Sequence, residues 1–325
     1  MKNNEIKKLF TEISDELLIF EKNYKSILQS RVNLINEIGR YISKAKGKRI
    51  RPALLLLCAK YFGDIDEKII DAATIVELLH TATLIHDDVV DKADKRRGQK
   101  SINNRWENKI AVLMGDFLFS RSLLKLVALE HRDILNDISR TTEHLSTGEL
   151  LQIEKSSDQG MSESIYYEMI FYKTASLFST SCKIGAKLKG ATRQFYRSME
   201  NYGKYFGMAF QIKDDLFDIT GKTENTGKPI GLDVKQNILT LPVIYTIDRL
   251  DSDNSAQIKE MMESKSDIDV EELSYYVEKA GGFKYSRQKI NEYSRKAKNS
   301  LTIIKNNEIK QSLLALVDYN INRKR

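Results

Sequence analysis

An apolar segment that ends in three carboxylates constrains the fold most strongly. The run over residues 79–85 leads into Asp87, Asp88 and Asp91. In a helix, residues three and four positions apart lie on the same side, so these aspartates crowd toward one edge. Like charges placed in this way repel one another. The segment therefore predicts an apolar helix whose end binds a cation, most simply a metal ion.

A second cluster repeats the pattern. An apolar segment with helical spacing passes through Gly203 and Gly207 and reaches Asp214, Asp215 and Asp218. A glycine inside a helix costs about 1 kcal/mol relative to alanine, so these two predict close helix packing or space for a ligand. One acidic helix end arises by chance and usually faces water. Two that share the order Asp-Asp-x-x-Asp indicate a common metal-binding function.

Helical spacing of apolar residues continues along most of the chain. The 325 residues include only three prolines, which favours helix over sheet. We expect an N-terminal helical arm over about residues 1–45, followed by helices over 53–62, 68–91, 105–130, 133–155 and 162–189, from 199 to the second cluster, from 240, and over 255–323. No linker or repeat divides the chain, so we expect a single domain over residues 1–325.

Charge and cysteine content narrow the surroundings of the protein. The net charge of +7 is dispersed among acidic residues, which is typical of solvated helix faces. Cys58 and Cys182 lie in apolar runs without metal-site spacing and predict buried thiols in a reducing compartment. Residues 1–6 carry no apolar signal core, and no run approaches the roughly 18 apolar residues of a membrane span. We therefore expect a cytoplasmic protein without a transmembrane segment.

Several basic residues are candidates for binding an anion. Residues 44–52 hold five of them around Gly47, and Pro52 suits the first turn of the next helix. Backbone amides at that helix start, with Lys48 and Arg51, would form an anion site, although a basic loop alone is usually only solvated. Lys173 interrupts an apolar pattern, and structural and ligand-binding roles fit it equally well. His80 lies about two turns before the first cluster on roughly the same side.

The two clusters predict chemistry on a diphosphate. Carboxylates select Mg²⁺, with Mn²⁺ as the alternative, over zinc or copper. Six carboxylates and a diphosphate carry about nine negative charges, which three divalent ions would largely offset. The chain has no Gly-x-x-x-x-Gly-Lys-Ser/Thr motif for a nucleotide. Metal ions would stabilise a departing diphosphate, and apolar helices would keep water from the carbocation left behind.

These motifs together carry a family resemblance. The chain resembles the trans-isoprenyl diphosphate synthases, also called polyprenyl synthetases, across nearly its whole length. The shared motifs are Gly47-Lys48-Arg49-x-Arg51-Pro52, Asp87-Asp88-x-x-Asp91 followed by Arg96-Arg97-Gly98, Lys173-Thr174, Gln211 with Asp214-Asp215-x-x-Asp218, and Gly227-Lys228-Pro229. The resemblance implies an all-α isoprenoid-synthase bundle around a deep central cavity. It also implies a prenyltransferase that is usually a homodimer and binds no nucleic acid.

The resemblance assigns a role to each motif. Mg²⁺ would be held by Asp87, Asp91 and Asp214, with Asp88, Asp215 and Asp218 supporting the ions or their waters. Isopentenyl diphosphate would be bound by Lys48, Arg51, His80 and Arg97. The allylic diphosphate would be bound by Arg96, Lys173, Thr174, Gln211 and Lys228. Of these, Lys173, Thr174 and Gln211 are the predicted catalytic residues. The allylic diphosphate ionises, isopentenyl diphosphate attacks the cation, and a proton is lost to the departing diphosphate.

One departure from the family pattern lies after the second cluster. Many members have Gly-Lys where this chain has Asn237-Ile238, so one cationic contact to the allylic diphosphate is missing. Lys235 is the nearest substitute along the chain. This position varies among the family's longer-chain members, so activity is still expected.

The residues before the first cluster bear on product length. Short-chain members block the cavity there with aromatic residues, whereas this chain has Ala82 and Thr83. The growing tail could then pass toward Val76, Ala73 and Ala72. We therefore expect a product longer than farnesyl diphosphate, of heptaprenyl type for a quinone side chain, with geranylgeranyl diphosphate as the alternative. Such a long apolar product would bring the enzyme close to a membrane.

Three other classes compete with this interpretation. A terpene cyclase shares the metal chemistry but has no need of an isopentenyl pocket. A non-catalytic subunit of a two-component synthase would tend to lose the aspartates, and all six are present here. A nucleic-acid-binding protein would account for the charge, but not for two acidic clusters that repel phosphate.

Overall fold

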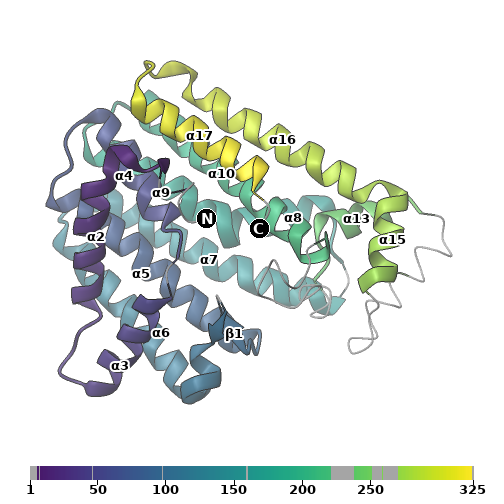
Figure 1. The fold of residues 1–325 in the computed structure, drawn as a ribbon, viewed down its shortest axis with the longest axis horizontal. Coiled ribbons are helices and arrows are strands. Elements are labelled where there is room, and N and C mark those ends of the chain that lie inside the picture. Colours follow the sequence, from purple (N-terminus) through teal and green to yellow (C-terminus); the bar gives the residue numbers. More distant parts are fainter. Residues whose placement is uncertain are drawn as a thin grey trace. The chain divides into compact units, whose positions relative to one another are not determined.

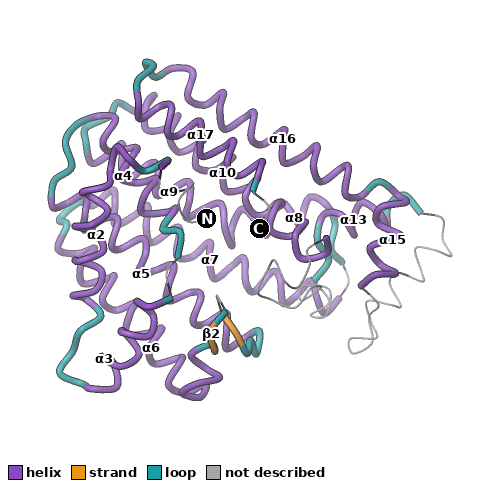
Figure 2. The backbone as a smooth tube through the Cα atoms, viewed as in Figure 1, coloured by secondary structure: helices purple, strands orange, loops and turns teal. Residues whose placement is uncertain are grey.

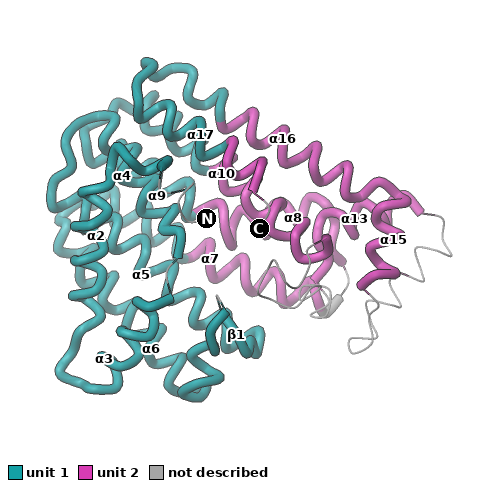
Figure 3. Tube along the Cα trace, in the orientation of Figure 1, with its two compact units in different colours: residues 1–142, 177–203, 298–317 teal, residues 143–176, 204–297, 318–325 magenta. Residues whose placement is uncertain are grey.

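A computed structural model describes residues 6, 8–45, 47–96, 98–158, 160–220, 238–250, 258 and 270–323. They divide into two compact units, each assembled from three separate segments of the chain (Figure 3). Unit 1 comprises residues 1–142, 177–203 and 298–317, and unit 2 comprises residues 143–176, 204–297 and 318–325. Over the described residues the secondary structure is helical apart from one two-stranded hairpin (Figure 2). The predicted all-α class is confirmed.

Unit 1, teal in Figure 3, contains most of the first half of the chain, and Figure 1 labels its elements. Its elements are η1 (Thr11–Ile13), α2 (Ser14–Ile27), α3 (Asn33–Lys44), α4 (Ile50–Phe62), α5 (Glu67–Val90), β1 (Lys95–Arg96), β2 (Gln99–Lys100), α6 (Ile102–Ala128), most of α9 (Ser176–Leu188) and η3 (Leu301–Ile303). The longer helices α7 (Arg132–Asp158), α10 (Arg193–Thr220), α16 (Gly282–Ser300) and α17 (Glu308–Asn322) have residues in both units.

Helix α5 is the central helix of unit 1. The Asp66 side chain caps its start by accepting from the Ile69 N–H at 3.0 Å. It packs against α2, α4 and α6, and its apolar side chains are buried almost continuously from Ile69 to Ala82. Among the described residues it is the one helix long and apolar enough to cross a membrane, yet 72% of that stretch is buried inside the protein. Its apolarity is therefore that of a core helix.

Unit 2 forms around its own core. Its helices are α8 (Glu163–Ile170), α13 (Leu241–Ile247) and α15 (Val270–Ala280), with the π-helix η2 (Phe171–Ala175) directly after α8. Side chains from these helices and from α10 are fully buried together, among them Tyr166, Ile212, Leu241 and Val277. Thr240 precedes α13 and Pro242 lies in its first turn, as predicted.

Most predicted helices are confirmed, with two corrections. The predicted helix over 162–189 is interrupted by η2, and the predicted helix over 105–130 begins at Ile102 and is kinked at Glu107, whose φ is 72°. Part of the predicted helical stretch over 255–323 lies outside the described residues. Gly203 confirms close packing, because an added Cβ would lie 2.4 Å from the Phe178 carbonyl oxygen.

The two cysteines are buried, as predicted, but the structure also brings them together. Both side chains are fully buried in unit 1, and the Cys182 thiol lies within hydrogen-bonding reach of Cys58. Burial raises the pKa of Cys182 well above its usual value, and the contact with Cys58 adds to this. Cys182 is therefore a neutral core thiol.

Candidate active site

The first aspartate motif ends helix α5 in a tight reversal. Asp91 is the C-cap residue directly after Val90, and Lys92 follows with a left-handed φ of 49°. The Ala93 N–H donates to the Asp88 carbonyl at 2.9 Å, and the Lys92 N–H donates to the Val89 carbonyl at 3.3 Å. This is the Schellman pattern of helix ends, here with lysine where glycine is usual. The reversal directs the chain back along α5 and into the hairpin of β1 and β2.

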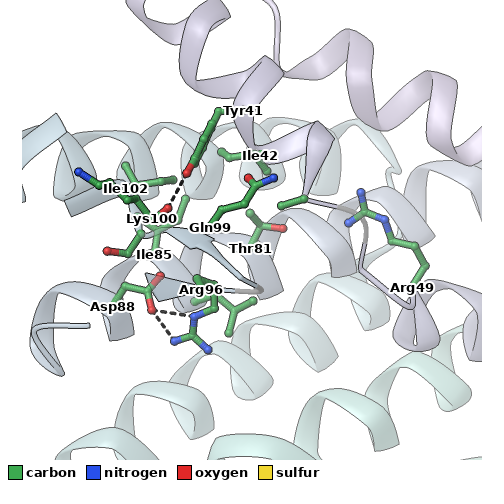
Figure 4. Close-up of a pocket in the computed structure, with 13 residues that line it drawn as sticks. Tyr41, Ile42, Arg49, Thr81, Ile85, Asp88, Arg96, Gln99, Lys100 and Ile102 are labelled. Atoms are coloured by element: carbon green, nitrogen blue, oxygen red, sulfur yellow. Dashed lines mark hydrogen bonds and ion pairs between the residues drawn. The ribbon is translucent and has the colours of Figure 1, made fainter. Parts of the chain in front are cut away.

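The hairpin places Arg96 on the middle aspartate of this motif. The Asp88 carboxylate accepts from Arg96 at the same oxygen, Oδ1, from Nε at 2.7 Å and from Nη2 at 2.5 Å (Figure 4). Asp88 is only 4% exposed, whereas Asp87 and Asp91 are half-buried. The pair borders a pocket of unit 1 that also includes Ile85. Asp88 is thus held by a cation of its own chain, and the outer aspartates are more accessible.

Two residues predicted to bind isopentenyl diphosphate are in contact in unit 1. Arg51, in the first turn of α4, has Nη1 3.1 Å from Nε2 of His80 on α5, and its guanidinium lies 4.3 Å from the centre of the Phe178 ring. Lys48 is exposed just before α4. The structure therefore brings Arg51 and His80 into contact beside a helix start, where backbone N–H groups favour an anion. The predicted Arg97 lies outside the described residues.

The second motif lies on the part of α10 that belongs to unit 2. Its middle aspartate, Asp215, is 4% exposed and accepts two hydrogen bonds on different oxygens. The Tyr166 hydroxyl donates to Oδ2 at 2.5 Å, and the Gln211 amide donates to Oδ1 at 2.7 Å. Asp214 and Asp218 are half-buried. As in the first motif, the chain satisfies the middle carboxylate and leaves the outer two more accessible.

The end of the chain reaches the first aspartate of this motif. Arg323 follows α17, and its Nη1 lies 2.5 Å from Asp214 Oδ1. The Arg323 side chain is 4% exposed and also donates to the Phe210 carbonyl at 2.9 Å and to the Asn320 side chain at 2.8 Å. Burial, together with the charge of Arg323, lowers the pKa of the neighbouring Lys213. Sequence analysis missed Arg323, because no motif links it to a residue 109 positions away.

The predicted catalytic residues Lys173 and Thr174 lie in the π-helix η2. The Lys173 ammonium lies 2.8 Å from Glu149 Oε1 and donates to Gln152 at 3.0 Å. Helix α7 packs closely against η2 at Gly148. A Cβ at this position would lie 2.6 Å from the backbone nitrogen of Lys173, so a larger residue would prevent the packing. Single turns of π-helix are frequent at functional sites, since they re-aim side chains.

A hydrogen-bonded chain joins η2 to the second motif within unit 2. The Thr174 hydroxyl donates to the Gln211 amide oxygen at 2.7 Å, and the Gln211 amide nitrogen donates to Asp215. The structure thus connects two predicted catalytic residues, Thr174 and Gln211, to Asp215, which was predicted to support the metal ions. Tyr166, at the other end of this chain, was missed, because a tyrosine in an apolar helix gives no signal beyond core packing.

The residues predicted to set the product length lie on α5, before the first aspartate motif. Ala82 is buried, and Thr83 is half-buried with its hydroxyl donating to the His80 carbonyl at 3.0 Å. Ile238, at the departure from the family pattern, is 6% exposed and supplies no charge. Lys228, Lys235 and Asn237 lie outside the described residues.

The outer aspartates suit a hard divalent cation. Asp87, Asp91, Asp214 and Asp218 offer only carboxylate oxygens, the ligands that Mg²⁺ prefers. Over the part of the chain that the structure describes, no three His, Cys, Asp or Glu side chains gather closely enough to hold an ion by themselves. A metal ion at either motif would therefore take further oxygen ligands from water or from a substrate. This is usual for Mg²⁺, which keeps waters and binds substrate phosphates.

The chain is similar to known proteins over most of its length. The family model for polyprenyl synthetase matches residues 32–280. The chain is 33% identical over 303 residues to octaprenyl diphosphate synthase of Haemophilus influenzae, covering 93% of this chain and 92% of that protein. It is 37% identical over 243 residues to heptaprenyl diphosphate synthase component 2 of Geobacillus stearothermophilus, covering 74% and 76%.

A solved structure is also similar to this chain along nearly its whole length. Polyprenyl synthase of Caulobacter crescentus, crystallised with calcium and isoprenyl diphosphate, superposes with a TM-score of 0.93 at 28% identity and covers 98% of both chains. The family match spans well over half of this chain, and the relatives align along most of their length. The chain therefore belongs to the polyprenyl synthetase family and is a prenyltransferase of the trans-polyprenyl diphosphate synthase class.

Proposed function

We propose that this enzyme condenses isopentenyl diphosphate head-to-tail with an allylic diphosphate, in a Mg²⁺-dependent reaction, to a product longer than farnesyl diphosphate. The observation that carries the proposal is the shared plan of the two aspartate motifs. Each buries its middle carboxylate against a donor of its own chain and leaves its outer carboxylates, as oxygen ligands, more accessible. The calcium and isoprenyl diphosphate bound to the Caulobacter crescentus protein support the same chemistry.

Each group of residues has a separate task in the proposed reaction. When bound by Asp87, Asp91 and Asp214, up to three Mg²⁺ ions supply Lewis-acid stabilisation of the leaving diphosphate. Lys48, Arg51, His80 and Arg97 bind isopentenyl diphosphate. Arg96, Lys173, Thr174, Gln211 and Lys228 bind the allylic diphosphate. Asp88, Asp215 and Asp218 support the metal ions or their waters. The Thr174 hydroxyl and Gln211 amide are oriented by their mutual hydrogen bond, so they present fixed dipoles to the allylic cation.

The proposed product is of heptaprenyl type. Ala82 and Thr83 are small, and the α5 face before them continues through buried Val76 and Ala73. Relatives named octaprenyl and heptaprenyl diphosphate synthase support a long product, and geranylgeranyl diphosphate is the shorter alternative. We propose that the reaction takes place in the cytoplasm, with the long product bringing the enzyme to a membrane surface.

Exposed apolar side chains on helix α6 are the reason to propose a homodimer. The side chains of Leu113, Leu124 and Val127 are 55%, 65% and 66% exposed. Their spacing places all three along one side of the helix. An exposed apolar stripe of this kind marks a protein interface. We propose that two copies of the chain, each a single synthase domain over residues 1–325, meet along this stripe.

A second candidate function is that of one subunit in a two-component synthase. Its support is the 37% identity to heptaprenyl diphosphate synthase component 2. The six aspartates argue against a non-catalytic subunit. Activity of the purified chain without any other protein would favour the homodimer, whereas activity that requires a second polypeptide would favour the two-component synthase.

The test is the length of the product made in vitro. Purified protein receives farnesyl diphosphate, isopentenyl diphosphate and Mg²⁺, and the dephosphorylated products are separated by chromatography. We expect prenyl alcohols well beyond geranylgeraniol. A product that stops at the geranylgeranyl length would favour the shorter alternative, and failure to extend farnesyl diphosphate would contradict the proposal.

A further inference from the structure

Arg49 lies between Lys48 and Arg51 in the basic loop, yet its environment differs from theirs. Its side chain is only 10% exposed, whereas Lys48 is exposed. Arg49 Nε donates to Glu21 on α2 at 2.8 Å, and Nη1 donates to Glu77 on α5. Two carboxylates therefore occupy this guanidinium, and its position in the loop does not make it a ligand for a substrate anion.

One partner of Arg49, Glu77, is itself buried, and the other, Glu21, is half-buried. Glu77 is 3% exposed, and a buried carboxylate needs a paired cation. The Tyr24 ring lies under the guanidinium at 4.7 Å, and its hydroxyl is 2.9 Å from the Thr81 hydroxyl. Burial raises the pKa of Tyr24 to about 12, and the charge of Glu77 adds to this. Burial alone would lower the pKa of Arg49, but Glu77 holds it above its usual value.

The backbone at Arg49 is also unusual. Its φ of 51° is left-handed, and the residue caps α4, with its carbonyl accepting from the Ala53 N–H at 3.0 Å. A left-handed conformation is unfavourable for a residue with a Cβ and persists where surrounding contacts enforce it. The contacts to α2 and α5 are of this kind, because they hold the Arg49 side chain inward. The same backbone turn joins exposed Lys48 to the first turn of α4, which carries Arg51.

We propose that Arg49 is a positioning residue for isopentenyl diphosphate: its pairs with buried Glu77 and half-buried Glu21 fix the turn that presents Lys48 and Arg51 to the diphosphate. The inference rests on the proposed function of these two residues. It also links the loop to His80, because Glu77 and His80 are three residues apart on α5 and therefore neighbours on its surface. The allylic diphosphate is bound by other residues, so its affinity should not depend on Arg49.

A purely structural role and direct ligation make different predictions. A structural arginine would lower the melting temperature without separating the two substrates. A direct ligand would behave like Lys48, and conservative replacement by lysine would keep most of the affinity. Loss of a positioning arginine raises only the dissociation constant of isopentenyl diphosphate. Lysine at this position restores it only in part, because an ammonium is a point charge without the planar fork that directs Nε to Glu21 and Nη1 to Glu77.

The experiment measures the dissociation constants of isopentenyl diphosphate and farnesyl diphosphate by calorimetry on the full chain. For Arg49→Met we expect the constant for isopentenyl diphosphate to rise on the order of 10-fold, as for one lost charge-assisted contact, and that for farnesyl diphosphate to change less than about twofold. Arg49→Lys should lie between Arg49→Met and wild type. Glu77→Gln should shift the same constant in the same direction.

The matched control is Arg105→Met. Arg105 also stacks on aromatic rings in unit 1, at 4.6 Å from both Tyr41 and Trp106, but it is exposed and pairs with no carboxylate that the structure describes. It should bind both substrates as wild type does. Lys48→Ala serves as the benchmark for a direct ligand.

Several results would overturn the inference. Equal loss of affinity for both substrates, or wild-type affinity for isopentenyl diphosphate in folded Arg49→Met, would do so. If Arg49→Met does not fold, the other two variants provide the test. Wild-type affinity for isopentenyl diphosphate in both Arg49→Lys and Glu77→Gln would then overturn the inference. Wild-type protein that binds isopentenyl diphosphate without condensing it contradicts the proposed function and leaves this comparison intact. Wild-type protein that does not bind it contradicts both.

Discussion

The two aspartate motifs have the same sequence pattern but different supports. In the first, both donors to Asp88 come from Arg96, which is eight residues away and 25% exposed. In the second, Asp215 accepts from fully buried Tyr166 and from Gln211, so its two oxygens serve two neutral donors. An arginine again contacts the second motif, but it is Arg323, and it pairs with the first aspartate.

The two motifs share the burial pattern of their three aspartates and differ in the groups that contact the middle one. In both motifs the middle aspartate is 4% exposed and the outer two are half-buried. The outer aspartates therefore share a function, which we assign to the metal ions. The middle aspartates share a position, but the donors that the structure describes differ: a charged arginine contacts the first aspartate, and two neutral groups contact the second.

The largest effect is expected from the outer aspartates. Asp87→Ala and Asp214→Ala each remove a metal ligand and should lower turnover at least on the order of 1,000-fold, while the helical content stays unchanged. Steady-state incorporation of isopentenyl diphosphate and circular dichroism would measure this. Near-normal turnover in both variants would contradict the metal assignment.

The middle aspartates should differ in stability. Asparagine at 215 keeps one acceptor but points an amide N–H₂ at a second donor, which leaves a buried group unpaired and should cost about 1 to 3 kcal/mol. Asparagine at 88 can still accept both Arg96 contacts on its single oxygen, so Asp88→Asn should cost less than about 1 kcal/mol. Urea unfolding of the two variants would give both values. A larger loss of stability in Asp88→Asn than in Asp215→Asn would contradict the proposed difference between the donors to the two middle aspartates.

The arginines provide the next comparison. Arg323→Met removes a side chain that is 4% exposed, together with its contacts to Asp214 and the Phe210 carbonyl, so it should lower stability by about 1 to 3 kcal/mol and turnover about 10-fold. Arg96→Met should mainly raise the KM for the allylic diphosphate, again about 10-fold, because Arg96 is accessible to substrate. Kinetics and thermal unfolding on both variants would show whether the two roles separate.

The smallest effect is expected from metal alone. Neither motif gathers enough described ligands to hold an ion unaided, so Mg²⁺ by itself should raise the melting temperature only slightly. Mg²⁺ with inorganic pyrophosphate should stabilise more, by about 2.7 kcal/mol at 100 times the dissociation constant. Thermal scans with Mg²⁺, pyrophosphate and both together would test this. A full shift with Mg²⁺ alone would show that the protein completes the site without a phosphate.

Sequence reasoning found the features that depend on local spacing. The aspartate clusters, the basic loop and the apolar helix before the first motif follow from the three- and four-residue periodicity of a helix. The catalytic group of Lys173, Thr174 and Gln211 depended on resemblance, because spacing alone left Lys173 undecided. The all-α class followed from composition and periodicity together.

What sequence reasoning missed depends on contacts between distant residues. Tyr166 and Arg323 lie 49 and 109 residues from the aspartates they contact, and nothing local marks either of them. The π-helix at Lys173 is permitted by Gly148 on another helix. Arg49 was counted among the loop's basic residues, and only its burial between Glu21 and Glu77 separates it from its neighbours.

The central claim is prenyl transfer at a site where metal ions and the outer aspartates hold a diphosphate. The most direct measurement is the incorporation of labelled isopentenyl diphosphate into extractable product by the wild-type chain, with farnesyl diphosphate as primer, in Mg²⁺ and in excess EDTA. We expect incorporation in Mg²⁺ and its loss in EDTA. Equal incorporation under both conditions, or none with Mg²⁺, would contradict the claim.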